Sequence, residues 1–138
     1  MEERIRKRKI VLVGTGFVGM SFAYSLLSEK GINELVLIDM NKDKAVGEQM
    51  DLSDGLPYAD SKMTIKAGEY EECGDADIVV ITAGAAQKPG QTRLELVGIN
   101  ARITKDVATQ VKNSGFKGIL VVASNPVDIM TYVAYKAR

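Results

Sequence analysis

Three glycines near the start of the sequence have the spacing of a phosphate-binding turn. Gly14, Gly16 and Gly19 form the pattern G-x-G-x-x-G directly after the apolar run KIVLV and before a stretch with helical spacing. In this pattern the first glycine permits a tight turn, the second lets the backbone approach a pyrophosphate, and the third lets the helix pack closely on the strand. The free N–H groups at the start of the helix would then face the phosphates.

An acidic residue follows at the distance that this motif requires. Asp39 comes directly after the apolar run ELVLI, about 20 residues beyond the last glycine of the motif. A carboxylate there accepts hydrogen bonds from both hydroxyls of an adenosine ribose and repels a 2′-phosphate, which favours NAD over NADP. An S-adenosylmethionine-binding domain shares this topology and is the functional alternative on these residues alone. A glycine turn beside a surface aspartate is the structural alternative.

A second group of residues could contact a small anionic ligand. The stretch AAQKPGQTR, residues 85–93, sets Gln87, a lysine and Arg93 around a Pro-Gly turn. An apolar run ends just before it in residues small enough for backbone to pass near a cofactor, namely Thr82, Ala83 and Gly84. Asn125 ends another apolar run, where such folds place ligand contacts. It could equally be the N-cap of a helix that begins at Pro126.

The composition excludes several other classes of site. The 138 residues balance 18 Lys+Arg against 18 Asp+Glu, so no overall field favours nucleic acid or a membrane surface as a partner. Cys73 is the only cysteine and histidine is absent, so we expect no disulfide framework, no metal site and a cytoplasmic location. Residues 1–8 form a basic leader, and the glycine-rich run after it is too short for a membrane span or signal core.

Short β-branched runs alternate with longer amphipathic stretches along the chain. The predicted strands are Lys9–Val13, Glu34–Ile38, Met63–Ala67, Asp77–Thr82 and Gly118–Ala123. The predicted helices are Met20–Lys30 with Gly31 as its cap, Lys42–Leu52, Leu94–Asn113 and Pro126–Lys136, with SDGLPYAD, residues 53–60, as a turn. Strands that alternate with helices imply a mostly parallel sheet, and continuously apolar strands suit a sheet covered on both faces. We expect one doubly wound α/β domain over residues 1–138, with strand order 3-2-1-4-5 and ligands at the carboxyl ends of strands 1 and 4.

Four segments together resemble the L-lactate dehydrogenase family. They are GTGFVG, LVLIDMNKDKAVGEQMDL, DADIVVITAGAAQKPGQTRLELVGIN and SNPVDIMTY. The resemblance runs from about residue 9 to residue 138, and the loop motif combined with SNPVD is specific to lactate and malate dehydrogenases. It implies a Rossmann domain that is followed in the family by a substrate domain, and hydride transfer between NADH and a 2-oxo acid.

The resemblance also assigns roles to individual residues. It places the cofactor pyrophosphate on the segment that contains Gly14, Gly16, Phe17, Val18 and Gly19. It places the adenosine ribose on Asp39, and further cofactor contacts on Thr82, Ala83 and Gly84. Arg93 matches the loop arginine that polarises the substrate carbonyl in the transition state. Asn125 matches the asparagine that contacts the substrate and the nicotinamide ribose.

Gln87 occupies the position at which the family discriminates between substrates. Malate dehydrogenases carry an arginine there, which pairs with the second carboxylate of oxaloacetate. A neutral glutamine fits the methyl end of pyruvate instead, because an unpaired carboxylate would be costly to desolvate. The resemblance therefore implies lactate rather than malate.

The sequence also departs from the family pattern. Gln91 stands where the loop usually has glutamate, and Gly98 and Ile99 stand where charged residues are common. The family's histidine proton donor, its partner aspartate, the arginine that clamps the substrate carboxylate and the sixth strand of the sheet all lie later in the family's sequences. Without a proton source or a clamp, the alkoxide is not protonated and pyruvate is not held. We expect the chain alone to bind NAD(H) weakly and to be catalytically incomplete.

Two classes of function remain open at this stage. The chain is either the cofactor domain of an L-lactate dehydrogenase, or of a malate dehydrogenase-like 2-hydroxy acid dehydrogenase, or it is a stand-alone or engineered nucleotide-binding module without activity. A domain separated from its substrate half exposes apolar surface, and such surface favours self-association. Since the predicted helix Leu94–Asn113 belongs to a region that supports subunit pairing in the family, we expect a homo-oligomer.

Overall fold

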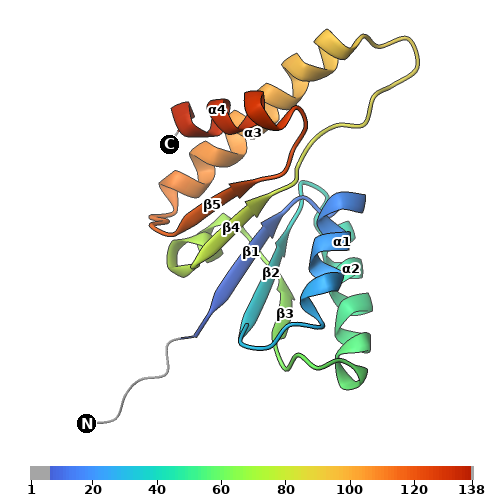
Figure 1. Cartoon of the computed structure of the whole chain (residues 1–138), viewed down its shortest axis with the longest axis vertical. Coiled ribbons are helices and arrows are strands. Elements are labelled where there is room, and N and C mark those ends of the chain that lie inside the picture. Colours follow the sequence, from blue (N-terminus) through green and yellow to red (C-terminus); the bar gives the residue numbers. More distant parts are fainter. Residues whose placement is uncertain (1–6, 138) are drawn as a thin grey trace.

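Five parallel strands form the centre of the molecule in the computed structural model, which describes residues 7–137. The strands are β1 (Lys9–Val13), β2 (Glu34–Ile38), β3 (Thr64–Ala67), β4 (Ile78–Ile81) and β5 (Ile119–Val122). They lie in the order β3-β2-β1-β4-β5, and each neighbouring pair is parallel (Figure 1). This confirms the predicted doubly wound α/β fold and its strand order. The leader predicted over residues 1–8 lies outside the described residues, apart from Lys7 and Arg8.

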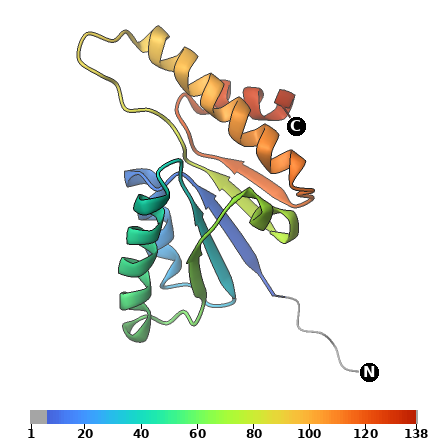
Figure 2. The ribbon, with the colours of Figure 1, turned by 180° about the vertical axis from the view of Figure 1, so that it is seen from behind.

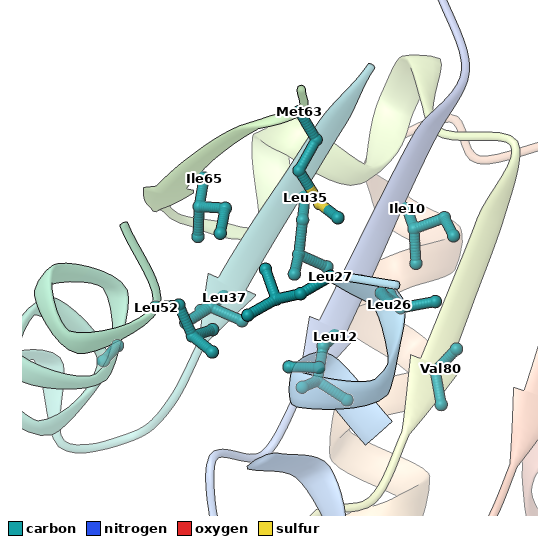
Figure 3. Packing of buried hydrophobic residues seen from close by; sticks show 12 residues of the cluster. Ile10, Leu12, Leu26, Leu27, Leu35, Leu37, Leu52, Met63, Ile65 and Val80 are labelled. Atoms are coloured by element: carbon teal, nitrogen blue, oxygen red, sulfur yellow. The ribbon is translucent and has the colours of Figure 1, made fainter. Parts of the chain in front are cut away.

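Helices cover both faces of the sheet. They are α1 (Phe17–Leu26), α2 (Lys42–Gly55), α3 (Arg93–Asn113) and α4 (Val127–Ala137). Alternate side chains of β1 point to opposite faces, so Ile10 and Leu12 enter a core with residues of α1 and α2. Val11 and Val13 enter a second core with residues of α3. Figure 2 shows α3 and α4 on the other face of the sheet from α1 and α2, and Figure 3 shows the first core.

The first helix begins and ends earlier than the sequence pattern predicted. It spans Phe17–Leu26 rather than Met20–Lys30, so its first turn lies inside the glycine motif. Its C-cap is Leu27, and Gly31, the predicted cap, has a φ of 96° in the connection that follows. The N-cap is Gly16, which makes no side-chain capping bond. A helix start without a capping side chain leaves no polar signal in the sequence, which explains the misplaced boundary.

Other boundaries also differ from the prediction. Helix α2 continues to Gly55 and a 3-10 helix, Leu56–Tyr58, follows it, so the predicted turn over residues 53–60 is largely helical. A second 3-10 helix, Tyr70–Asp75, was not predicted. Helix α4 begins at Val127, and the Pro126 carbonyl accepts the Met130 N–H at 2.9 Å. Pro126 therefore holds the N-cap position, and the alternative prediction of Asn125 as that cap is wrong.

The amino-terminal edge of the sheet is held by ion pairs. Lys9 is buried, and its Nζ lies 2.7 Å from Glu72 Oε2 and 2.6 Å from Asp75 Oδ1. Lys66 Nζ lies 2.8 Å from Glu34 Oε1 and 3.1 Å from Glu72 Oε1. These contacts tie the Tyr70–Asp75 helix to β1 and β3, opposite the carboxyl edge where ligands bind in such sheets. Within residues 7–137, no helix is both long and apolar enough to cross a membrane.

Candidate functional site

The first glycine of the motif occupies a position that only glycine fits. Gly14 has a φ of 106°, in the left-handed region that glycine adopts without strain. A β-carbon built on it would lie 2.6 Å from the Ala83 nitrogen and 2.9 Å from the Thr82 carbonyl carbon. The turn between β1 and α1 therefore lies against the end of β4. This contact brings together two of the predicted parts of the cofactor site.

Gly19 determines how closely α1 approaches that turn. A β-carbon on Gly19 would lie 2.0 Å from the Gly14 carbonyl oxygen and 2.6 Å from Thr82 Oγ1. The Thr82 hydroxyl itself donates a hydrogen bond to the Gly14 carbonyl at 2.9 Å. Both contacts agree with the close-packing role predicted for the third glycine of the motif.

The start of α1 is open to a ligand. Gly16 is exposed, and a β-carbon there would meet nothing within 4 Å. Phe17 and Val18, which follow it, are also exposed. Because no side chain caps this end of the helix, its first N–H groups and the positive end of the helix dipole are available to an anion. A pyrophosphate fits these features, since it needs close backbone approach and several N–H donors.

Asp39 is bonded to the same turn. Its Oδ2 accepts the Thr15 N–H at 2.8 Å and the Thr15 hydroxyl at 2.7 Å, and its Oδ1 accepts the Asn41 N–H at 2.9 Å. Partial burial raises the pKa of the Asp39 carboxyl, but these hydrogen bonds and the charge of Lys44 outweigh it and lower the pKa below its ordinary value. The group is therefore an ionised acceptor at neutral pH, as a ribose diol requires.

Two members of this cluster, Thr15 and Lys44, were not predicted from the sequence. Thr15 is fully buried, and Lys44, in the first turn of α2, donates from Nζ to the Thr15 carbonyl and lies 3.4 Å from Glu48 Oε1. The motif carries no signal for Thr15, because it stands at a variable position of the fingerprint. The available signal for Lys44 was a cation on the helix that begins beside the predicted ribose carboxylate.

A groove of about 550 Å³ lies between α1 and α2, next to this cluster. Thr15, Gly16 and Lys44 line it together with apolar residues of the two helices, among them Met20 and Leu52. Residues 82–84 do not line it. The groove therefore adjoins the predicted cofactor site and does not contain the whole of it.

At the carboxyl edge of the sheet, the residues after β4 are hydrogen-bonded to the end of β1 and to the segment that follows β5. The Thr82 N–H donates to the Val13 carbonyl at 2.9 Å, and the buried Ser124 hydroxyl donates to the Ala83 carbonyl at 2.7 Å. Asn125 follows as an exposed residue with a cis bond to Pro126. The structure thus places Thr82 and Ala83 beside the glycine turn, and it places Asn125 at the end of the neighbouring strand.

The loop between β4 and α3 contains a compact turn at its tip. It extends away from the sheet in Figure 1 (yellow). The Gln91 N–H donates to the Lys88 carbonyl at 3.0 Å across Pro89 and Gly90, whose φ of 80° fits a type II turn. The Gln91 side chain accepts the Lys88 N–H at 3.0 Å, and Gln87 Nε2 donates to the Gln91 carbonyl at 2.8 Å. Gln87, the predicted specificity residue, is therefore hydrogen-bonded to this turn.

Arg93 is the first residue of α3 and is exposed. Thr92 caps this helix in a reciprocal capping box with Glu95, which fixes where the helix begins. The buried Asn100 side chain accepts the Ala85 N–H at 2.8 Å and so holds the base of the loop. Within residues 7–137, no hydrogen bond or ion pair joins Gln87 or Arg93 to the glycine turn or to Asn125. These loop residues are thus not assembled with the rest of the site.

The Tyr70–Asp75 helix contributes no group suited to proton transfer near neutral pH. Burial raises the pKa of the Cys73 thiol to about 11 and that of the Tyr70 phenol to about 12, so neither group ionises near neutral pH. Among the described residues, no group of His, Cys, Asp or Glu side chains is arranged to hold a metal ion. The geometry offers N–H donors for phosphates, a carboxylate for a diol and an exposed guanidinium.

Known proteins share this combination. Residues 8–138 match the family model of the lactate/malate dehydrogenase NAD binding domain. The L-lactate dehydrogenase of Lactococcus lactis subsp. cremoris is 58% identical over 133 residues, which cover 96% of this chain and 42% of that protein. The chain therefore spans less than half the length of such relatives.

Solved structures agree with the sequence comparison. The minor L-lactate dehydrogenase of Enterococcus mundtii in its ligands-bound form has a TM-score of 0.91 and 55% identity, over 95% of this chain and 42% of that one. The malate dehydrogenase of Archaeoglobus fulgidus, solved in complex with NADH, has a TM-score of 0.85 and 39% identity, over 94% of this chain and 44% of that one. The chain belongs to the lactate/malate dehydrogenase family, of which it is an NAD-binding domain.

Proposed function

We propose that this chain is the NAD-binding domain of an L-lactate dehydrogenase, which interconverts pyruvate and L-lactate with NADH. The observation that carries the choice of substrate is the neutral Gln87 on the loop before α3. A second carboxylate on the substrate would lose its hydration there without gaining a charged partner. The similarity to L-lactate dehydrogenases supports the same choice.

The cofactor side of the proposal follows from the glycine turn. NADH supplies the hydride when it is bound. Gly16, Phe17 and Val18 offer backbone N–H groups to the pyrophosphate at the uncapped start of α1, and Gly14 and Gly19 allow the turn and the helix packing that present those groups. Asp39 holds the adenosine ribose through its ionised carboxylate. Thr82, Ala83 and Gly84 offer close backbone contact at the end of β4.

The substrate side of the proposal depends on three residues. The Arg93 guanidinium, which is exposed and lies at the start of α3, polarises the substrate carbonyl and stabilises the charge that develops on its oxygen. Asn125, at the end of β5, donates to the substrate and contacts the nicotinamide ribose. Gln87 lies beside the substituent that distinguishes pyruvate from oxaloacetate. These groups come together only if the loop moves toward the sheet.

The isolated chain should not turn over pyruvate. It contains no histidine, the side chain whose ordinary pKa suits proton donation near neutral pH. No group is therefore matched to donate a proton to the alkoxide near pH 7.

Self-association is also part of the proposal, because Ile119 of β5 and Tyr132 of α4 are exposed apolar side chains. Size-exclusion chromatography that shows only monomer at high concentration would contradict it.

Gln87→Arg tests the proposed substrate in a protein that joins this domain to a substrate-binding half. We expect the ratio of kcat/KM for oxaloacetate to that for pyruvate to rise by about tenfold to a hundredfold, because the arginine pairs with the second carboxylate. Ala86→Arg adds the same charge to an exposed neighbouring position and should change the ratio much less. A parent protein that prefers oxaloacetate would show that the malate dehydrogenase-like alternative holds instead.

A further inference from the structure

Thr15 controls the orientation of the Asp39 carboxylate. We propose that Thr15 is a positioning residue for the adenosine ribose: it occupies Asp39 Oδ2 with two hydrogen bonds and leaves Oδ1 as the oxygen that receives the sugar. This inference rests on the assignment of Asp39 to that ribose, which is part of the proposed function. It adds a specificity role for a residue at a variable position of the glycine motif.

Three of the four acceptor positions of the Asp39 carboxylate are already occupied. Each oxygen of an ionised carboxylate has about two acceptor positions. On Oδ2, the Thr15 N–H at 2.8 Å and the Thr15 hydroxyl at 2.7 Å take both of them. On Oδ1, the Asn41 N–H at 2.9 Å takes one. The free position therefore lies on Oδ1, and a hydroxyl of the ribose can reach the carboxylate there without breaking an existing bond.

Thr15 is itself held in place. It is fully buried, and its carbonyl accepts a hydrogen bond from Lys44 Nζ. If Asp39 turned to another rotamer, the Thr15 hydroxyl would lose its acceptor at a buried position and its desolvation would go uncompensated. The native orientation of Asp39 is thus favoured over its other rotamers before any ligand arrives.

The position of Thr15 in the chain joins two subsites. It lies between Gly14, which packs on the end of β4, and Gly16, which opens the start of α1. The backbone that would meet the pyrophosphate therefore also holds the ribose carboxylate. A 2′-phosphate on the ribose would meet a carboxylate that cannot turn away, which strengthens the rejection of NADPH.

The test compares Thr15→Val, which removes the hydroxyl at nearly constant shape, with Thr15→Ser, which keeps it. Titration of the chain with NADH and NADPH, followed by NMR so that weak binding is measured, should show Thr15→Val binding NADH about threefold to tenfold more weakly. The same variant should discriminate less against NADPH, because Asp39 is free to turn. Thr15→Ser should retain both properties.

Two controls keep the result specific. Thr109→Val makes the same chemical change on α3, where the hydroxyl bonds only to the Lys105 carbonyl of its own helix, and should change neither affinity. The pKa of the Asp39 carboxyl, followed by NMR without cofactor, should rise in Thr15→Val and not in Thr15→Ser. If Thr15→Val does not fold, Thr15→Ala removes the same hydroxyl and adds no atoms.

The outcomes separate this inference from the assignment on which it depends. Unchanged NADH affinity and cofactor preference in Thr15→Val, together with their loss in Asp39→Ala, would overturn the role of Thr15 and keep that of Asp39. An Asp39→Ala variant that binds both cofactors like the parent chain would overturn both, as would a parent chain that binds neither. Weaker NADH binding in Thr15→Val with recovery in Thr15→Ser supports the proposal.

Discussion

The β-carbon that Gly19 lacks would lie 2.0 Å from the carbonyl oxygen of Gly14. Helix α1 can therefore lie against the glycine turn only because position 19 carries no side chain. The same approach brings the uncapped start of α1 next to Thr82 at the end of β4. A packing contact between two glycines thus determines where the proposed phosphate site lies.

Gly19→Ala should destabilise the domain, because the added methyl group meets backbone that cannot move aside. We expect the free energy of unfolding in urea to fall by about 1–3 kcal/mol, and NADH binding to weaken. Gly47→Ala is the matched control, since Gly47 lies on the exposed side of α2 and its β-carbon would meet nothing within 4 Å. The control should raise the free energy of unfolding by up to about 1 kcal/mol. Equal effects of the two substitutions would contradict the argument.

The strands could be predicted from the sequence because each one is marked by a short run of apolar residues within the strand itself. The run KIVLV is buried along its whole length, and the structure gives it the predicted bounds, Lys9–Val13. The boundary of α1 was missed because Gly16 caps it without a side chain. The 3-10 helix Tyr70–Asp75 was missed because Lys9, distant in the sequence, pairs with its acidic residues. Such long-range contacts leave no periodic pattern.

Residues of the candidate site could be predicted from the sequence where the backbone geometry allows only one residue type. Gly14 and Gly19 belong to this class, because a β-carbon at either position would collide with backbone. Thr15 and Lys44 were missed because their importance comes from contacts with each other and with Asp39. The roles of Gln87 and Arg93 rest on the family resemblance, since no hydrogen bond or ion pair among the described residues joins either side chain to the glycine turn.

Gly98→Ala should stabilise the domain. Gly98 lies within α3, it does not have a positive φ, and its β-carbon would meet nothing within 4 Å. Alanine in a helix interior is favoured over glycine by about 1 kcal/mol, so the thermal midpoint should rise. Gly115→Ala, just after the same helix, should lower the midpoint, because Gly115 has a φ of 88°. A lower thermal midpoint in Gly98→Ala would contradict this expectation and would mean that the added methyl group collides with another molecule packed on this part of α3.

Cys73 should react slowly with thiol reagents while the domain is folded. Its side chain is fully buried, and burial raises the pKa of the thiol to about 11, so little thiolate is present at pH 8. We expect a disulfide reagent to modify it at a rate that follows unfolding, and rapidly once urea has unfolded the chain. Rapid modification of the folded chain would show that the Tyr70–Asp75 helix opens readily.

Acid should destabilise the domain through the partners of Lys9. Hydrogen bonds from Lys9 lower the pKa of Glu72 and of Asp75 below their ordinary values of 4.5 and 3.8. A carboxyl whose pKa is lower in the folded state contributes stability above its unfolded-state pKa and loses it as the pH falls through the folded-state value. The free energy of unfolding should therefore decline progressively between about pH 5 and pH 2.

Lys9→Met should make that decline shallower, because it removes the charge that lowers both pKa values. For Lys9 itself, burial lowers the pKa, but the hydrogen bonds to Asp75 and Glu72 outweigh it, so the pKa lies above its ordinary value of 10.5 and Lys9 stays charged throughout the acid range. Lys42→Met is the matched control, since it removes an exposed ion pair with Glu69, and exposed pairs contribute little. Asp39, whose pKa is also lowered, gives the same residual slope in all three proteins. Urea unfolding at a series of pH values measures the slopes, and equal slopes for Lys9→Met and the parent chain would place the acid sensitivity elsewhere.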